Sequence, residues 1–238
     1  MVHLALCFLI LCSFFIKAEE FKYFSEGGQD KFFHKMFFKN KRDGFFVDIG
    51  ASDGTTFSNT CFFERSLGWK GICIEPAPDA FELLCQRRRN SICIEGCIAD
   101  YTGRGTYADG GLLGGLVDKL DPRFKYTPII KCGILQGKVK TLEVSCYVLS
   151  DILDRYNVCH IDFLSIDVEG AEFDILKTID FQKCAIDCIT VEINIDGDTK
   201  IRAFLEDRGF VFLKKKRVDE FYARKLFLLQ NRHLFDRN

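Results

Sequence analysis

Residues 45–54 have the sequence FFVDIGASDG, in which a short apolar run leads into an acidic residue and a glycine-containing turn. The run has the length of a buried strand, and Gly50 and Gly54 favour a tight turn because glycine adopts positive φ at no steric cost. A helix is expected directly afterwards, at residues 59–67. Strand, glycine turn and helix in this order open a βαβ unit. The stretch therefore predicts an α/β fold with a ligand site at the carboxyl end of the strand.

The same alternation continues along most of the chain. A helical spacing of apolar residues precedes the stretch, at residues 29–40. After it we expect strands at 70–76, 91–94, 142–149, 162–167 and 186–193, and helices at 78–89, 150–156, 171–178 and 200–208. The last two strands, 210–213 and 221–229, are joined by so short a connection that they must be antiparallel. The pattern predicts a Rossmann-like, mostly parallel seven-stranded sheet with an antiparallel terminal hairpin.

Length and charge set limits on the architecture and the partners. The chain has 238 residues, enough for one sizeable domain, and a formal net charge of −1. Bulk electrostatics therefore give no reason to expect a nucleic-acid partner. Two basic runs, residues 87–89 and 214–217, are expected to be solvated helix ends or turns.

The first residues predict a leader. Residues 4–16 are apolar except for Ser13, which is shorter than the roughly 20 residues that span a bilayer. They resemble the core of a secretory signal peptide that is cleaved after Ala18, although Ile16 is bulky for its position and no Lys or Arg precedes the run. The alternative is an uncleaved signal anchor through residues 4–16, the only membrane contact we expect. We divide the chain into a leader, 1–18, and one domain, 19–238, and predict the secretory pathway.

The twelve cysteines do not indicate whether the protein folds in an oxidising compartment. No Cys-x-x-Cys pair occurs, so a structural zinc site is not expected. Several cysteines lie inside apolar runs, where a free thiol packs as a small hydrophobe. Disulfide pairing is left open by the sequence.

The loop after the first strand favours a cationic ligand. It lacks the Gly-x-Gly-x-x-Gly pattern of a pyrophosphate site, and it begins with the carboxylate of Asp48. A carboxylate suits a ligand that carries an amine, and S-adenosylmethionine carries both a sulfonium and an ammonium. We therefore predict S-adenosylmethionine as the cofactor. The cofactor-binding residues in this loop are predicted to be Asp48, Gly50, Ala51, Ser52, Asp53 and Gly54.

Two further acidic residues extend the predicted cofactor site. Glu75 ends the next strand, about 20 residues beyond the loop, where a carboxylate can accept hydrogen bonds from both ribose hydroxyls. Asp100 follows the third strand and the segment 96–99, which would form the adenine edge, and could bond the adenine amine or serve as a simple turn residue. Together with the expected hairpin, these positions favour the class I methyltransferase architecture over a plain dinucleotide fold.

Three segments resemble a known family. They are FVDIGA at 46–51, GICIEP at 71–76 and SIDVEGAE at 165–172, and together they are similar to the FkbM-type methyltransferases. The sequence SEGGQD at 25–30 also resembles an N-terminal element of that family, with Glu26 in place of a Gln. The resemblance runs from about residue 25 to residue 229. It implies O-methylation, often of a sugar hydroxyl on a glycan or a glycosylated metabolite.

Candidate catalytic residues lie in the third segment. Asp167 ends a strand that we expect beside the Asp48 strand, so Asp167 and Glu169 are predicted to act on the acceptor, with Glu192 as a weaker third. The alternative is that Asp167 or Glu169 only caps the following helix. Three carboxylates could also hold Mg²⁺ or Ca²⁺, but no His-x-His or Asp-Asn pair supports this, and we predict no metal site.

The fold also occurs in secretory-pathway proteins that bind partners or act in trafficking without catalysis, and fold alone never proves activity. A nicotinamide oxidoreductase is disfavoured by the missing glycine pattern. Residues 100–137 lose the strand and helix pattern and are predicted to shape the pocket for a sugar-containing acceptor. Within them, the glycine-rich sequence GGLLGG at 110–115 is predicted to be a mobile loop or lid. The aromatic residues of the segment 100–137, which could stack on sugar rings or close a small core, are Tyr101, Tyr107, Phe124 and Tyr126. The oligomeric state is left open.

Overall fold

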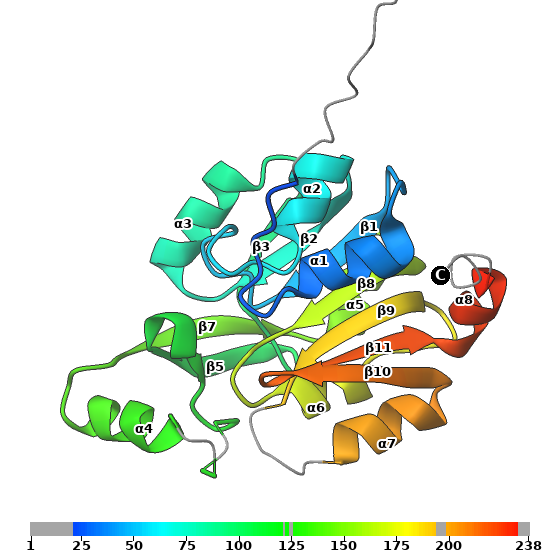
Figure 1. Cartoon of the computed structure of the whole chain (residues 1–238). Helices are drawn as coiled ribbons and strands as arrows, with labels where there is room; N and C mark the ends of the chain where they lie inside the picture. Colours follow the sequence, from blue (N-terminus) through cyan, green and yellow to red (C-terminus); the bar gives the residue numbers. More distant parts are fainter. Residues whose placement is uncertain (1–20, 121, 124–125, 194–198, 233–238) are drawn as a thin grey trace, which may run out of the picture.

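The computed structural model describes residues 21–120, 122–123, 126–193 and 199–232. In it a twisted central sheet carries helices on both faces, and a smaller sheet lies beside it (Figure 1). The predicted leader lies outside the described residues, so its cleavage stays a prediction. No helix in the described part of the chain is long and apolar enough to cross a membrane.

The larger sheet contains seven strands in the order β10-β11-β9-β8-β1-β2-β3. Only β11 runs antiparallel to its neighbours, which confirms the predicted Rossmann-like sheet with a terminal hairpin. The edge is formed by β10, because β11 pairs with β9. The strands are β1 (Phe45–Ile49), β2 (Lys70–Glu75), β3 (Ile92–Glu95), β8 (His160–Ile166), β9 (Ala185–Glu192), β10 (Phe210–Lys216) and β11 (Asp219–Arg224).

Successive residues of β1 point to opposite faces of this sheet, and each face has its own hydrophobic core. Val47 and Ile49 pack on the face covered by α5 (Leu149–Arg155), α6 (Glu172–Lys177) and α7 (Lys200–Asp207). Phe46 packs on the opposite face. That face is covered by α1 (Gln29–Phe33), the π-helical turn η1 (His34–Phe38), α2 (Cys61–Leu67), α3 (Pro78–Arg87) and α8 (Lys225–Gln230).

Phenylalanine builds most of this second core. The ring of Phe33 lies 4.7 Å from that of Phe163 and 5.3 Å from that of Phe221, so the N-terminal helix is fixed to both β8 and β11. Tilted and edge-on ring contacts of this kind add to the free energy gained by burial. The contacts hold the N-terminal segment over the carboxyl edge of the sheet. In this way Gln29, the first residue of α1, comes to lie at the ligand site.

The smaller sheet corrects two predictions. The strand expected at 142–149 is β7 (Lys140–Tyr147), and it belongs to a four-stranded sheet, β4-β7-β5-β6, rather than to the main sheet. Residues 100–137 also hold regular structure: β5 (Gly103–Asp109), the 3-10 turn η2 (Gly111–Leu113), β6 (Gly115–Leu116) and α4 (Thr127–Leu135). The glycines of β5 lower its intrinsic propensity to form a strand, but antiparallel pairing with β7 stabilises the strand nevertheless. The remaining strand, β4 (Cys97–Ile98), pairs with β7.

The C-terminal prediction is also corrected. The strand expected at 221–229 ends at Arg224, and the chain continues as α8 (Lys225–Gln230), a helix packed on the phenylalanine-rich face through Phe227. Apolar runs of this length do not separate strand from helix by periodicity alone, so the change of element could not be seen in the sequence.

The turn after β1 requires glycine. Gly50 has φ of 82°, and a Cβ built there would lie 1.8 Å from the carbonyl oxygen of Asp167. The amides of Gly50 and Ala51 both donate to the carbonyl of Ile74 at 3.0 Å. The backbone of Asp167 in turn donates to the carbonyl of Ile49 at 3.0 Å. This close approach ties together the ends of β1, β2 and β8, and it places Asp167 directly beside the loop.

Candidate active site

A cavity of about 1110 Å³ opens at the carboxyl edge of the main sheet. Most of the predicted site residues line it, and the small sheet and the N-terminal segment close its sides. The predicted residues in the lining are Asp48, Gly50, Ala51, Ser52, Glu75, Asp167, Glu169 and Glu192. Three others, Asp53, Gly54 and Asp100, do not belong to the lining.

Asp53 and Gly54 shape the loop from behind. One carboxylate oxygen of Asp53 accepts hydrogen bonds from the backbone amides of Thr55 and Thr56, at 2.8 and 2.7 Å, and thereby closes the turn. Gly54 has φ of 79°, and a Cβ there would lie 2.7 Å from Cγ of Arg88. The glycine makes room for a buried side chain rather than for a ligand.

Asp100 is engaged outside the cavity. Its carboxylate accepts a hydrogen bond from Nζ of Lys119 at 2.8 Å, and the same ammonium reaches Asp174 at 2.9 Å. The preceding residues Gly96, Cys97 and Ile98 do line the cavity. The predicted adenine edge is therefore available from this segment, while Asp100 ties the small sheet to α6.

Glu75 is buried at the end of β2 with its carboxylate at the cavity. Its two oxygens accept hydrogen bonds from the backbone amides of Ser52, at 2.8 Å, and Ala77, at 2.9 Å. Burial raises the pKa of Glu75 to about 7. Each oxygen keeps a further lone pair, so the carboxylate can also accept from a ligand diol.

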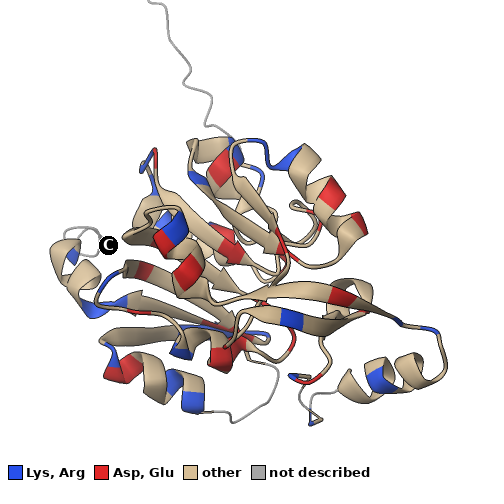
Figure 2. Ribbon diagram, turned by 180° about the vertical axis from the view of Figure 1, so that it is seen from behind, with Lys and Arg blue, Asp and Glu red and all other residues tan. Residues whose placement is uncertain are grey.

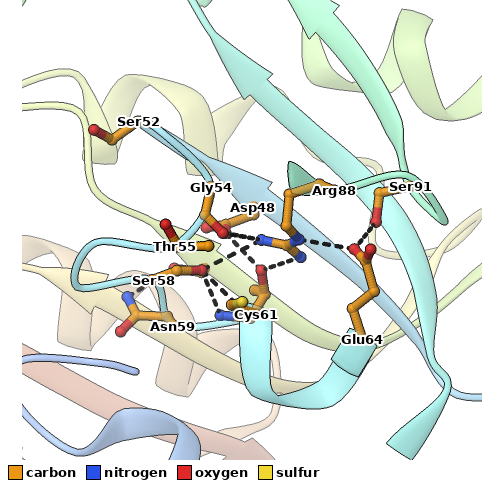
Figure 3. A network of polar contacts seen from close by, with 12 residues as sticks. Asp48, Ser52, Gly54, Thr55, Ser58, Asn59, Cys61, Glu64, Arg88 and Ser91 are labelled. Atoms are coloured by element: carbon orange, nitrogen blue, oxygen red, sulfur yellow. Dashed lines mark hydrogen bonds and ion pairs between the residues drawn. The ribbon is translucent and has the colours of Figure 1, made fainter. Parts of the chain in front are cut away.

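The carboxylate of Asp48 is buried and interacts with groups of the protein itself. Its carboxylate accepts a hydrogen bond from Oγ1 of Thr60 at 2.6 Å, and the guanidinium of Arg88 lies 3.8 Å away (Figure 3). Burial raises the pKa of Asp48, and the charge of Arg88 and the hydrogen bonds from Thr60, Ser165 and Ser58 act against that rise. Asp48 thus organises the loop, with its charge balanced by the protein.

Arg88 is the centre of this network and was not predicted from the sequence. It is fully buried, donates to Glu64 at 2.7 Å and to Thr60 at 2.8 Å, and also contacts the carbonyl of Gly54 and the hydroxyl of Ser58 (Figure 3). The prediction that residues 87–89 form a solvated helix end is wrong for this residue. Three consecutive arginines carry no periodicity, so only the end of α3 in its tertiary position decides which of them turns inward.

Three carboxylates form a second cluster at the ends of β8 and β9. One oxygen from each of Asp167, Glu169 and Glu192 lies within 4.8 Å of the others. Asp167 is open to the cavity, whereas Glu169 and Glu192 are buried. The spacing is also one that a divalent cation could bridge.

The structure does not show the alternative role, in which Asp167 or Glu169 caps the helix that follows. Helix α6 has no side-chain cap at its first turn, and the amides of Val168 and Gly170 donate instead to Glu172, at 3.2 and 3.0 Å. Glu169 has φ of 60°, a left-handed conformation that costs free energy in a non-glycine residue. Because Glu172 accepts these hydrogen bonds, the amides of the turn do not need Asp167 or Glu169 as acceptors.

Asp167 and Glu192 share a proton. Burial and the negative charges of Asp167 and Glu169 raise the pKa of Glu192 to about 12, so this side chain is protonated and donates to Asp167. Removal from bulk water raises the pKa of Asp167 to about 7, with the hydrogen bond from Glu192 acting against the rise. Asp167 still has surface open to the cavity, so its loss of hydration is partial. The pair resembles other carboxylate pairs in which two like charges cannot both ionise.

The profile described as the Methyltransferase FkbM domain matches residues 48–212. The chain belongs to the FkbM methyltransferase family. Its fold is that of the class I S-adenosylmethionine-dependent methyltransferases, and S-adenosylmethionine is its cofactor. No curated relative matches the chain by sequence.

The solved structures that resemble the chain are distant from it in sequence. The methyltransferase FkbM of Methylobacillus flagellatus KT is 15% identical with a TM-score of 0.45, over 76% of this chain and 43% of its own. The fibrillarin of Aeropyrum pernix, crystallised with natively bound S-adenosyl-L-methionine, is 13% identical with a TM-score of 0.46, over 83% and 76%. The precorrin-6y C5,15-methyltransferase of Geobacter metallireducens GS-15 is 12% identical with a TM-score of 0.45, over 86% and 89%. This chain spans less than half the length of the FkbM structure.

The residues at the cavity fit the cofactor. Glu75 offers acceptors for a ribose diol, and the segment 96–98 offers an apolar edge for a base. At the other end, the side-chain oxygens of Gln29 and Asn59 are buried without a hydrogen-bond partner. Asn59 was not predicted from the sequence, because a single polar residue before a helix is more often a cap.

We predict that Arg88→Met destabilises the fold. The substitution leaves Glu64 and Asp48 buried without their cation, which typically costs about 3–5 kcal/mol. Urea unfolding followed by circular dichroism measures the change. Arg89→Met is the matched control, since Arg89 is exposed and should change stability by no more than about 0.5 kcal/mol. Equal stability of the two variants would contradict the role given to Arg88.

We predict that Glu75→Gln weakens cofactor binding. The amide replaces a charged acceptor by one oxygen and a donor, so hydrogen bonds to the ribose worth about 1.5–3 kcal/mol are lost and the affinity falls about 10- to 100-fold. Isothermal titration calorimetry with S-adenosylhomocysteine measures the loss. Glu95→Gln is the control, because Glu95 pairs in register with Glu75 on β3 but is exposed and outside the cavity. Unchanged affinity in Glu75→Gln would remove this residue from the site.

Proposed function

We propose that this protein is an O-methyltransferase that acts on a sugar hydroxyl of a glycan or a glycosylated metabolite. Membership of the family supports methyl transfer from S-adenosylmethionine. The observation that supports an oxygen acceptor is the carboxylate pair at the cavity, in which Asp167 is open to the cavity and removal from bulk water raises its pKa to about 7. A hydroxyl must lose its proton as it is methylated, and a base with a pKa near neutrality is suited to accept it.

The cavity residues have separate roles in this reaction. The bound cofactor supplies a methyl group on a positively charged sulfur. When bound, the cofactor would donate this methyl group to the acceptor oxygen, and the electron pair of the broken carbon–sulfur bond would remain on sulfur. Asp167 accepts the hydroxyl proton, and Glu192, protonated, holds Asp167 in position through its hydrogen bond. Orientation of the acceptor oxygen in line with the bond to sulfur provides the remaining acceleration.

The shape and lining of the cavity support a carbohydrate acceptor. Its volume of about 1110 Å³ leaves room for a cofactor and an acceptor side by side. Tyr107 and Tyr126, two of the aromatic residues singled out in the sequence, lie in the lining, and Tyr101 does not. Aromatic rings stack on the apolar faces of sugars, and carboxylates accept their hydroxyl protons. Phe124 lies outside the described residues.

We also propose that the protein acts on its acceptor in the secretory pathway. The support is the apolar leader at residues 4–16. Expression of the full chain in eukaryotic cells should yield a protein that begins at Glu19, as read by N-terminal sequencing. A membrane-bound product that still carries residues 1–18 would favour the signal anchor, and an intact cytoplasmic product would contradict the proposal.

We predict that Asp167→Asn lowers kcat by about 100- to 10,000-fold, the usual contribution of a general base. Asparagine can still accept the hydrogen bond from Glu192, so the fold is preserved. In the parent, kcat/KM should rise about tenfold per pH unit up to about pH 7 and then level off, because Asp167 is active only when deprotonated. This rise should be absent in the variant. Transfer of labelled methyl from S-adenosylmethionine to a panel of oligosaccharides measures both.

The controls separate this function from its alternatives. Asp154→Asn, an exposed carboxylate on α5, should leave kcat unchanged. Assays with EDTA and with added Mg²⁺ test the alternative that the three carboxylates bind a divalent cation required for activity. The rate of methyl transfer should not depend on either addition. Binding of cofactor without transfer to any sugar would contradict the proposal and favour a non-catalytic, partner-binding role.

A further inference from the structure

Two buried amide oxygens without a hydrogen-bond partner belong to residues of the cavity lining. In the described part of the chain, five buried side-chain nitrogen or oxygen atoms have no hydrogen-bond partner. Two of them, Oε1 of Gln29 and Oδ1 of Asn59, belong to residues that line the cavity. These side chains are only 4% and 6% exposed. A buried acceptor left without a hydrogen bond costs free energy, which a ligand donor would recover.

The hydrogen bonds around Asn59 fix which way its amide points. Its nitrogen, Nδ2, donates to Oγ of Ser165 at 3.0 Å. The hydroxyl of Ser165 has one proton, and it is donated to the carboxylate of Asp48. Ser165 must therefore accept from Asn59, which excludes the flipped amide and leaves Oδ1 free. Figure 3 shows Asn59 beside Ser58 with its oxygen directed away from the Arg88 network.

The amide of Gln29 is fixed in a similar way from another element. Gln29 forms a hydrogen bond with the carboxylate of Asp219, which can only accept, so the donor is the amide nitrogen. The oxygen Oε1 is left without a partner. Both free atoms are therefore acceptors, and both lie among acidic groups that favour a cation.

The order of the strands decides which part of the cofactor these oxygens meet. Glu75, the ribose-binding position, ends β2 on one side of β1. Asn59 contacts β8 through Ser165, and Gln29 contacts β11 through Asp219, both on the other side of β1. Adenosine over β2 directs the amino-acid portion of the cofactor toward β8. The only hydrogen-bond donor in that portion is its α-ammonium group.

We propose that Oδ1 of Asn59, with Oε1 of Gln29 as a second acceptor, binds the α-ammonium group of S-adenosylmethionine. Asp48 acts one step away: it orients Ser165, which orients Asn59. This explains how a carboxylate that is committed to Thr60 and Arg88 still favours a cationic ligand. The inference rests on the cofactor and is independent of the acceptor.

The test compares two ligands that differ only in the amino-acid portion. S-Adenosylhomocysteine contains it, and 5′-methylthioadenosine keeps the adenosine and the thioether but lacks it. By titration calorimetry, Asn59→Ala should bind S-adenosylhomocysteine about 10- to 100-fold more weakly and 5′-methylthioadenosine within about twofold of the parent. Gln29→Ala should show the same selectivity with a smaller loss.

Asn90→Ala is the matched control, because Asn90 is exposed and lies outside the cavity. It should bind both ligands as the parent does, and circular dichroism should show that all variants are folded. Equal losses for the two ligands, or no loss in Asn59→Ala, would overturn the proposal. If the folded parent binds neither ligand, the assignment of S-adenosylmethionine as the cofactor is itself contradicted. This outcome is distinct from a failure to methylate sugars.

Discussion

The buried guanidinium of Arg88 holds the cofactor loop in place. It lies at the end of α3 and joins Glu64 on α2, Asp48 on β1 and the turn at Gly54. A buried cation of this kind is tolerated only because carboxylates and hydroxyls satisfy it on several sides. The loop from residue 50 to residue 60 makes few regular backbone hydrogen bonds of its own, so its shape depends on this network.

The sheet topology determines what the loop can do. Because β1 lies between β2 and β8, the ends of three parallel strands converge at Gly50, and the chain there has no space for a side chain. Glu75 and Asp167 consequently lie on opposite sides of one loop. The first suits the sugar of a nucleoside, and the second faces the remaining space. The predicted ribose-binding residue and the proposed general base thus lie on opposite sides of β1.

The carboxylates at the site have different tasks although they look alike in sequence. Asp48 is balanced by Arg88, and Asp53 closes a turn. Glu172 satisfies the backbone of the turn before α6, and Asp167 and Glu169 line the cavity. Basic and acidic residues are interleaved along the outer elements in Figure 2. The unbalanced negative charge is inside, at the ends of β8 and β9.

The sequence alone was enough to predict the main sheet, the cofactor and eight of the residues that line the cavity. Local patterns were sufficient because buried strands and glycine turns are set by neighbouring residues, as at residues 45–54. Tertiary structure decided the rest. Only packing shows that Arg88 turns inward, that β5 and β7 form a separate sheet, and that α8 follows β11. Asn59 and Gln29 come together at one cavity from distant parts of the chain. Hydrogen-bond partners that far apart in sequence leave no periodic signal, and the free oxygen of an amide is defined only once its nitrogen has found a partner.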